Sequence, residues 1–257
     1  MKIDSILILA AGMGTRLRPH TNNLPKSLLP LGDTNILRNL IMLSQNYFPK
    51  TKIYVNASYL ADKIINEITK FPPINRPIII WEPILLGPAV TVSEYCKINN
   101  HNVLVLHGDT YFSDLAFSQF AKSINQKKKD VSILLCHEKT RNKARSEIME
   151  KNGVIFSITE NSVSESSRSL TQSLPTEKVW SSSGALVIKR NALFSFLPEK
   201  NASISPTLIN YIAFNETLHL EKCTSDRISI DNEKSYLEAI RLNKRNPMLF
   251  DRSIRHQ

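Results

Sequence analysis

The first half of the chain alternates between short apolar runs and longer segments whose apolar residues recur at helical spacing. The apolar runs have the length of buried strands, and they cover residues 5–9, 52–56, 77–81, 103–107 and 131–136. The helical faces between them are formed by Leu37, Leu40, Ile41 and Ser44, by Leu60, Ile64, Ile65 and Ile68, and by Phe117, Phe120, Ala121 and Ile124. Because strands and helices alternate, the pattern predicts an α/β fold, a mostly parallel sheet with helices on both faces.

The second half of the chain is less regular. Residues 154–159 and 179–189 have the pattern of strands, whereas residues 204–214 and 234–242 have that of helices. The serine-rich stretch 161–173 favours a surface loop. We therefore expect a single domain over residues 1–242, followed by a basic C-terminal tail over residues 243–257.

The composition is that of a globular protein and excludes several other classes. With 42% hydrophobic and 22% charged residues in a chain of 257, it differs from disordered and fibrous proteins. No apolar run has the length of a membrane span or a signal segment, so we expect no membrane association. Cys96, Cys136 and Cys223 form no CxxC pair, which argues against a disulfide framework or zinc site and favours a reducing cytoplasm.

The formal net charge of +10 suggests an anionic partner. Nucleic acid is not expected, because basic residues are not interleaved with aromatic ones and no helix-turn-helix or zinc-finger spacing is present. The basic runs at residues 127–129 and 241–255 are typical of solvent-exposed faces. A small polyanion such as a nucleoside triphosphate fits the charge instead.

The loop after the first expected strand has the composition of a phosphate-binding segment. Small residues let its backbone approach a ligand and turn N–H groups toward an anion; they are Ala10, Ala11, Gly12 and Gly14. Arg16 and Lys26 add the two cation types that usually bind phosphate oxygens. A P-loop pattern is absent, and Leu17 stands where a dinucleotide-binding loop needs a small residue. By itself a G-x-G sequence is as often a tight turn without a ligand.

Two aspartates lie at the ends of expected strands, where open α/β sheets place ligand groups. Asp109 follows the strand 103–107, and Asp231 precedes the helix that begins near Lys234. Both have a competing interpretation, because a lone aspartate after a strand is often a turn former. Asp231 also has the position of a helix N-cap.

The run from residue 9 to residue 30 closely resembles the signature of the sugar-phosphate nucleotidyltransferases, LAAGxGTRLxPxTxxxPKxLxP, and meets each of its specified positions. Residues 82–91, 103–112 and 228–239 extend the resemblance with lower fidelity. Muramate-phosphate uridylyltransferases and heptose- or mannose-1-phosphate guanylyltransferases are the similar single-domain members. The resemblance implies a Rossmann-like, GT-A-like fold with a nucleotide-binding part over about residues 1–136 and a sugar-binding part over about 137–242.

The resemblance also implies a reaction and its residues. A nucleotidyl group passes from an NTP to a sugar 1-phosphate with release of pyrophosphate; UTP and GTP are the favoured donors, and CTP stays open. Asp109 and Asp231 would hold Mg²⁺, which prefers one or two carboxylates completed by water and phosphates. Arg16, Lys26 and Asp109 would be catalytic. The nucleotide-binding residues would be Leu9, Ala10, Ala11, Gly12, Gly14, Thr15, Arg16, Lys26 and Gly87, and the sugar-binding residues Glu160, Ser182 and Gly184.

Several positions depart from the family pattern. Pro88 and Val90 replace a threonine and a glycine of the base-binding loop, and Val90 is expected to narrow the approach. Asn161 replaces the lysine that usually contacts the sugar phosphate, Ser182 replaces an asparagine, and His107, at a position often held by asparagine, is expected to be a packed histidine. The missing cation has three candidate replacements, which are Arg141, Lys143 and Arg145. These changes support an alternative, a catalytically silent relative that binds nucleotide or sugar phosphate as a sensor or partner subunit.

Overall fold

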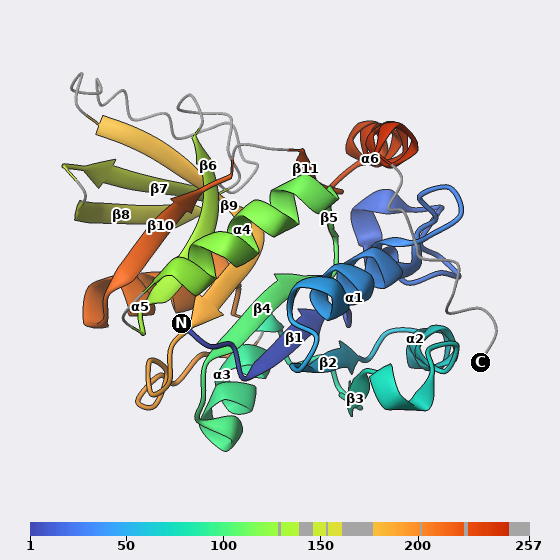
Figure 1. The fold of residues 1–257 in the computed structure, drawn as a ribbon, viewed down its shortest axis with the longest axis horizontal. Helices are drawn as coiled ribbons and strands as arrows, with labels where there is room; N and C mark the ends of the chain where they lie inside the picture. Colours follow the sequence, from blue (N-terminus) through green and yellow to red (C-terminus); the bar gives the residue numbers. More distant parts are fainter. Residues whose placement is uncertain are drawn as a thin grey trace.

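The described part of the chain folds around a nine-stranded sheet with a separate two-stranded sheet beside it (Figure 1). This computed structural model describes residues 1–127, 130–138, 146–152, 154–160, 177–200, 202–223 and 226–246. The strands are β1 (Ser5–Leu9), β2 (Lys52–Ala57), β3 (Ile78–Trp81), β4 (Val103–His107), β5 (Thr110–Phe112), β6 (Ser132–Glu138), β7 (Ser146–Lys151), β8 (Val154–Glu160), β9 (Glu177–Ile188), β10 (Leu218–Lys222) and β11 (Arg227–Ser229).

The main path of the large sheet is mostly parallel. Its order is β10-β6-β9-β4-β1-β2-β3, and β7 pairs with β9 and β8 off this path. Strands β3, β2, β1 and β4 are parallel, as are β6 and β10, whereas β9 lies antiparallel between β4 and β6. The register aligns Leu9 with both Asn56 and His107, so three strands end together at one edge of the sheet.

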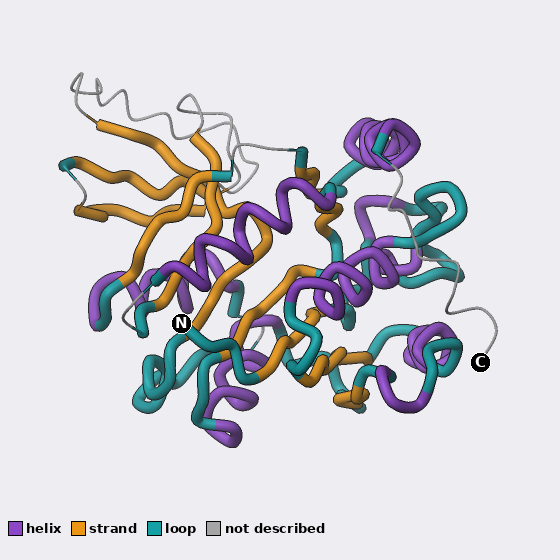
Figure 2. Tube along the Cα trace, in the orientation of Figure 1, coloured by secondary structure: helices purple, strands orange, loops and turns teal. Residues whose placement is uncertain are grey.

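Helices cover both faces of the sheet (Figure 2). They are α1 (Ile36–Tyr47), α2 (Ala61–Ile68), α3 (Pro88–Asn99), α4 (Asp114–Gln126), α5 (Asn210–Asn215) and α6 (Glu233–Arg245). Because side chains alternate along a strand, Ile6 and Ile8 pack in the core under α1, α2, α4 and α6, while Leu7 packs in the core under α3. The α/β fold class is therefore confirmed. None of the helices in the described ranges is long and apolar enough to cross a membrane.

The predicted helical faces are buried with one exception. All four residues of the α1 face, and all four of the α4 face, are inaccessible or nearly so. In α2 the face is narrower than predicted, because Ile65 is 39% exposed and Leu60 precedes the helix with a left-handed φ of 50°.

The second half differs more from the sequence expectation. Strands β5, β7 and β10 were not predicted, since they are short or carry polar residues such as the LHLEK of β10. The expected helix 204–214 is a π-helix over Ile204–Ile209 that continues into α5. Helix α6 runs through Arg245, and Asn243, the first residue of the expected tail, is buried and donates to the Leu31 carbonyl at 2.5 Å. Residues 161–173, 128–129 and 247–257 lie outside the described ranges.

Candidate active site

A cavity of about 520 Å³ opens where β1, β2 and β4 end. Ligand sites of open α/β sheets form at this carboxyl edge. The structure brings together in its lining nearly all residues that the sequence singled out, which are Leu9, Ala10, Ala11, Gly12, Gly14, Thr15, Arg16, Lys26, Gly87, Asp109, Ser182, Gly184 and Asp231. Glu160 ends β8, and its side chain lies outside the described part, as do Arg141, Lys143, Arg145 and Asn161.

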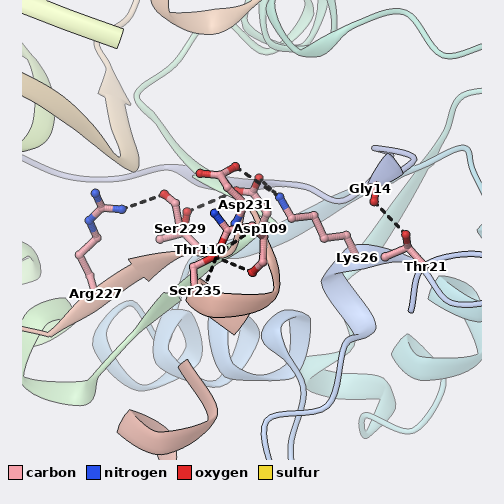
Figure 3. Close-up of polar contacts among 10 residues, drawn as sticks. Gly14, Thr21, Lys26, Asp109, Thr110, Arg227, Ser229, Asp231 and Ser235 are labelled. Atoms are coloured by element: carbon pink, nitrogen blue, oxygen red, sulfur yellow. Dashed lines mark hydrogen bonds and ion pairs between the residues drawn. The ribbon is translucent and has the colours of Figure 1, made fainter. Parts of the chain in front are cut away.

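The loop after β1 is fixed by polar contacts at both ends. The amides of Ala10 and Ala11 donate to Asn56 Oδ1 at 2.6 and 3.3 Å, so the protein itself occupies these two N–H groups. Further along, the hydroxyl of Thr21 donates to the Gly14 carbonyl at 2.8 Å (Figure 3). We therefore expect phosphate to meet Gly12 and the residues after it, instead of the two alanine amides.

Lys26 joins the two aspartates. Its Nζ lies 2.7 Å from Asp109 Oδ2 and 3.8 Å from Asp231 Oδ1 (Figure 3). Burial alone would raise the pKa of Asp109, but the charge of Lys26, together with its hydrogen bond, holds that pKa below the ordinary value. Burial lowers the pKa of the neighbouring His107, which is therefore neutral at pH 7. The centre of the cavity thus carries an ionised Asp109 beside a lysine.

Strand pairing explains why the two aspartates meet. Strand β11 pairs antiparallel with β5 and aligns Ser229 with Thr110, while the Ile230 amide donates to the Asp109 carbonyl at 2.9 Å. The competing cap interpretation of Asp231 is wrong, because Asn232 caps α6 by accepting from the Ser235 amide at 3.0 Å.

Gly184 packs against Thr110, the residue that follows Asp109, and this contact explains why position 184 is glycine. Its φ is +81°, a value that residues with a side chain rarely adopt. A Cβ there would overlap Thr110 Oγ1 and lie 2.9 Å from Thr110 Cβ. Glycine therefore lets β9 approach Thr110 closely. This packing reason for glycine is independent of the sugar contact that the sequence predicts for Gly184.

Glu82 is a site residue that the sequence did not single out. It follows β3, is 4% exposed and lines the cavity. Its Oε1 accepts from Asn56 Nδ2 at 2.9 Å and from Thr91 Oγ1 at 2.6 Å. Its Oε2 is also buried, with no hydrogen-bond partner among the described residues. The position of an acidic residue directly after an apolar run of strand length was the signal in the sequence.

Of the two residues that depart from the family pattern in the base-binding loop, Pro88 lines the cavity and Val90 does not. Gly87 precedes α3 and Pro88 begins it, a helix position where proline loses no intrahelical hydrogen bond. In this region Gly87, Pro88 and Thr91 line the cavity, whereas Val90 is not among the lining residues. The expectation that Val90 narrows the approach is therefore wrong.

Arg227 was also missed by the sequence analysis. It begins β11 and lines the cavity together with Ser229 and His137. Its Nη1 donates to Ser229 Oγ at 2.8 Å, and its Nη2 lies 2.9 Å from His137 Nδ1. A lone arginine at the start of a three-residue strand gives no periodic signal, so only the fold brings it to the site.

Known structures resemble this fold over nearly its whole length. A putative glucose-1-phosphate thymidylyltransferase from Bacillus anthracis, solved in complex with a sucrose, matches with a TM-score of 0.71 at 17% identity, covering 93% of this chain and 94% of that chain. HddC from Yersinia pseudotuberculosis, complexed with GMP-PN, matches with a TM-score of 0.68 at 20% identity over 93% and 99%. At these identities the likeness establishes the fold.

Sequence relatives match a shorter part of the chain. The bifunctional protein GlmU of Methanococcus maripaludis is 34% identical over 108 residues, which are 42% of this chain and 25% of that protein. The UTP–glucose-1-phosphate uridylyltransferase of a Synechocystis species is 42% identical over 59 residues, 23% of this chain and 15% of that protein. The chain spans about a quarter of the length of the GlmU relative. The family model described as nucleotidyl transferase matches residues 5–160, more than half of the chain, and the protein therefore belongs to the nucleotidyl transferase family.

Proposed function

We propose that this protein transfers a nucleotidyl group from an NTP to a sugar 1-phosphate and releases pyrophosphate. The observation that carries this function is the contact of Asp109 and Asp231 with one Lys26 ammonium, inside a cavity bordered by the glycine loop. Both substrates are phosphates, and the loop side of this cavity supplies Arg16 and Lys26 to bind them. Membership of the nucleotidyl transferase family supports the same reaction.

The donor set at the cavity fits Mg²⁺. In the described ranges no group of three or more histidine, cysteine or acidic side chains is placed to hold a metal, so the aspartate pair stands without further protein ligands of these types. Mg²⁺ prefers such a site, because it keeps water and substrate phosphates in its remaining positions. Asp109 and Asp231 would hold the ion, which would supply positive charge against the phosphates of the NTP.

The side chains of the cavity would align the two phosphate substrates and balance the negative charge of the reacting phosphates. An oxygen of the sugar phosphate attacks the α-phosphorus, and the bond from that phosphorus to the bridging oxygen of pyrophosphate breaks. Since the attacking oxygen is already anionic, no side chain has to remove a proton from it. Arg16 and Lys26 would stabilise the charge that develops on the leaving pyrophosphate.

Pyrophosphate release tests this function directly. The protein is incubated with Mg²⁺, each NTP in turn and a panel of sugar 1-phosphates, and pyrophosphate is measured for each pair. We expect release with at least one pair. Release with none of them would contradict the transferase and favour the silent relative.

Among the nucleobases, Glu82 favours guanine. Guanine presents two adjacent donors, N1–H and the N2 amino group, and one of them would donate to the unpartnered Oε2 of Glu82. Uracil presents a single N3–H between two carbonyl oxygens, and these would face the carboxylate with like charge. Because Oε2 has almost no accessible surface in this structure, the Glu82 side chain would turn toward the cavity, where Oε2 would gain a partner from guanine. We therefore propose GTP as the preferred donor over UTP.

Replacing Glu82 by glutamine is expected to reduce the preference for GTP. Glutamine keeps an acceptor for Asn56 and Thr91 but offers an amino group where Oε2 was. The ratio of kcat/KM for GTP to that for UTP should fall by about 10- to 100-fold, because a donor of guanine would lose its partner. Glu94→Gln, on the exposed side of α3, is the matched control and should leave the ratio unchanged. If Glu82→Gln leaves the ratio of kcat/KM values for GTP and UTP unchanged, Glu82 does not recognise the base.

A further inference from the structure

The cavity has a third cationic side chain that lies apart from the other two. Within the described ranges, the lysine and arginine residues that line it are Arg16, Lys26 and Arg227. Arg16 and Lys26 belong to the loop after β1, whereas Arg227 begins β11. Figure 3 shows Arg227 and Lys26 on opposite sides of Asp109 and Asp231. The acidic pair is therefore flanked by a cation on each side.

The polar contacts of Arg227 within the described ranges are hydrogen bonds, and none of them is an ion pair. Its guanidinium contacts the Ser229 hydroxyl and the His137 ring, and no carboxylate in the described ranges lies within 4.0 Å of it. Burial lowers the pKa of Arg227, although a guanidinium remains protonated at neutral pH. Partial burial of a charge without an ion-pair partner costs free energy unless an anion supplies one. Asp109 and Asp231 favour the charged form of Arg227 without forming an ion pair with it, so the guanidinium remains available to an anionic ligand.

A chain of hydrogen bonds across β11, β6 and β9 fixes the orientation of the Arg227 guanidinium. His137 on β6 lies 3.0 Å from Ser183 Oγ on β9, and Arg227 on β11 contacts that same ring. Ser181 and Ser182 of β9 line the adjacent cavity wall with hydroxyl groups. A fixed guanidinium binds two phosphate oxygens at once, and serine hydroxyls suit the hydroxyl groups of a sugar.

We propose that Arg227 binds the phosphate of the sugar 1-phosphate. This assignment rests on the proposed transferase function, in which two phosphate-bearing substrates meet at Asp109 and Asp231. In the proposed reaction the loop cations Arg16 and Lys26 would bind the triphosphate. The second anion would then approach from the other side of the aspartates, where Figure 3 shows Arg227 opposite Lys26. Arg227 thereby takes the place of the lysine that the family pattern leads one to expect at Asn161.

Steady-state kinetics of Arg227→Met tests the assignment, using the NTP and sugar 1-phosphate pair on which the wild-type protein is active. We expect the KM for the sugar phosphate to rise about 10- to 100-fold, the loss typical of a charged hydrogen bond, with the KM for the NTP unchanged. Arg227→Lys should give an intermediate rise, because an ammonium keeps the charge but loses the planar fork. Arg190→Met, an exposed arginine outside the cavity, is the matched control.

Two results would overturn the assignment. One is a wild-type KM for the sugar phosphate in Arg227→Met, and the other is an equal rise in both KM values, which indicates general damage to the site. If Arg227→Met does not fold, Arg227→Lys decides, and its KM for the sugar phosphate must rise. If the wild-type protein is active and the Arg227 variants are unaffected, only the assignment of Arg227 is contradicted. If the wild-type protein releases no pyrophosphate with any pair, the transferase function itself is contradicted.

Discussion

Replacing Asp109 by asparagine is expected to lower kcat by about 10²- to 10³-fold, the loss typical of removing one electrostatic group from a transition state. Asparagine has the shape of aspartate and keeps an oxygen that can accept from Lys26 Nζ, which lies 2.7 Å away. What it loses is the negative charge, which the low pKa of Asp109 maintains at neutral pH. Pyrophosphate release measures kcat, and a thermal melt shows whether the variant stays folded.

The matched control is Asp33→Asn, because Asp33 is exposed and lies outside the cavity lining. It should keep wild-type turnover. The same pair of variants separates an enzyme from a silent relative. A protein that only binds nucleotide, measured without metal, should keep most of its affinity after Asp109→Asn. Wild-type turnover in Asp109→Asn would show that this carboxylate takes no part in the reaction.

The sequence predicts best those parts of the fold in which burial requires a continuous run of apolar residues. Strands β1 and β4 have their predicted bounds, because both are buried on two faces and read as continuous apolar runs. The loop from Leu9 to Lys26 was identified because its small and cationic residues are close together along the chain. In both cases the physical cause lies within a short stretch of sequence.

The features that local patterns leave open depend on contacts between distant segments. Asp109 and Asp231 are 122 positions apart in the numbering, and only the pairing of β5 with β11 brings them together. Arg227 reaches the cavity through the same pairing, and Glu82 is placed by bonds from Asn56 and Thr91. Periodicity does not reveal which strands pair. Local spacing therefore marks acidic residues at strand ends, but it does not show that they meet in one cavity.

Gly108 and Gly12 offer a comparison within the same cavity. The Gly108 amide donates to the Leu9 carbonyl at 2.9 Å, which ties the end of β4 to the end of β1. A Cβ at position 108 would overlap the Leu9 carbonyl oxygen and lie 3.2 Å from Ala10 Cα, and both are backbone atoms that move only with their strand. A Cβ at position 12 would meet nothing within 4 Å.

Gly108→Ala is therefore expected to destabilise the protein, whereas Gly12→Ala is not. Overpacking of this kind costs about 3 kcal/mol at the upper end of its usual range. For a chain of this length that loss corresponds to a decrease in Tm of about 6–12 °C. Because the overlap separates β4 from β1, Asp109 should also move and kcat should fall. Differential scanning calorimetry measures the Tm of both variants. Equal melting temperatures for Gly108→Ala and Gly12→Ala would show that the two strand ends are not packed as tightly as their hydrogen bond indicates.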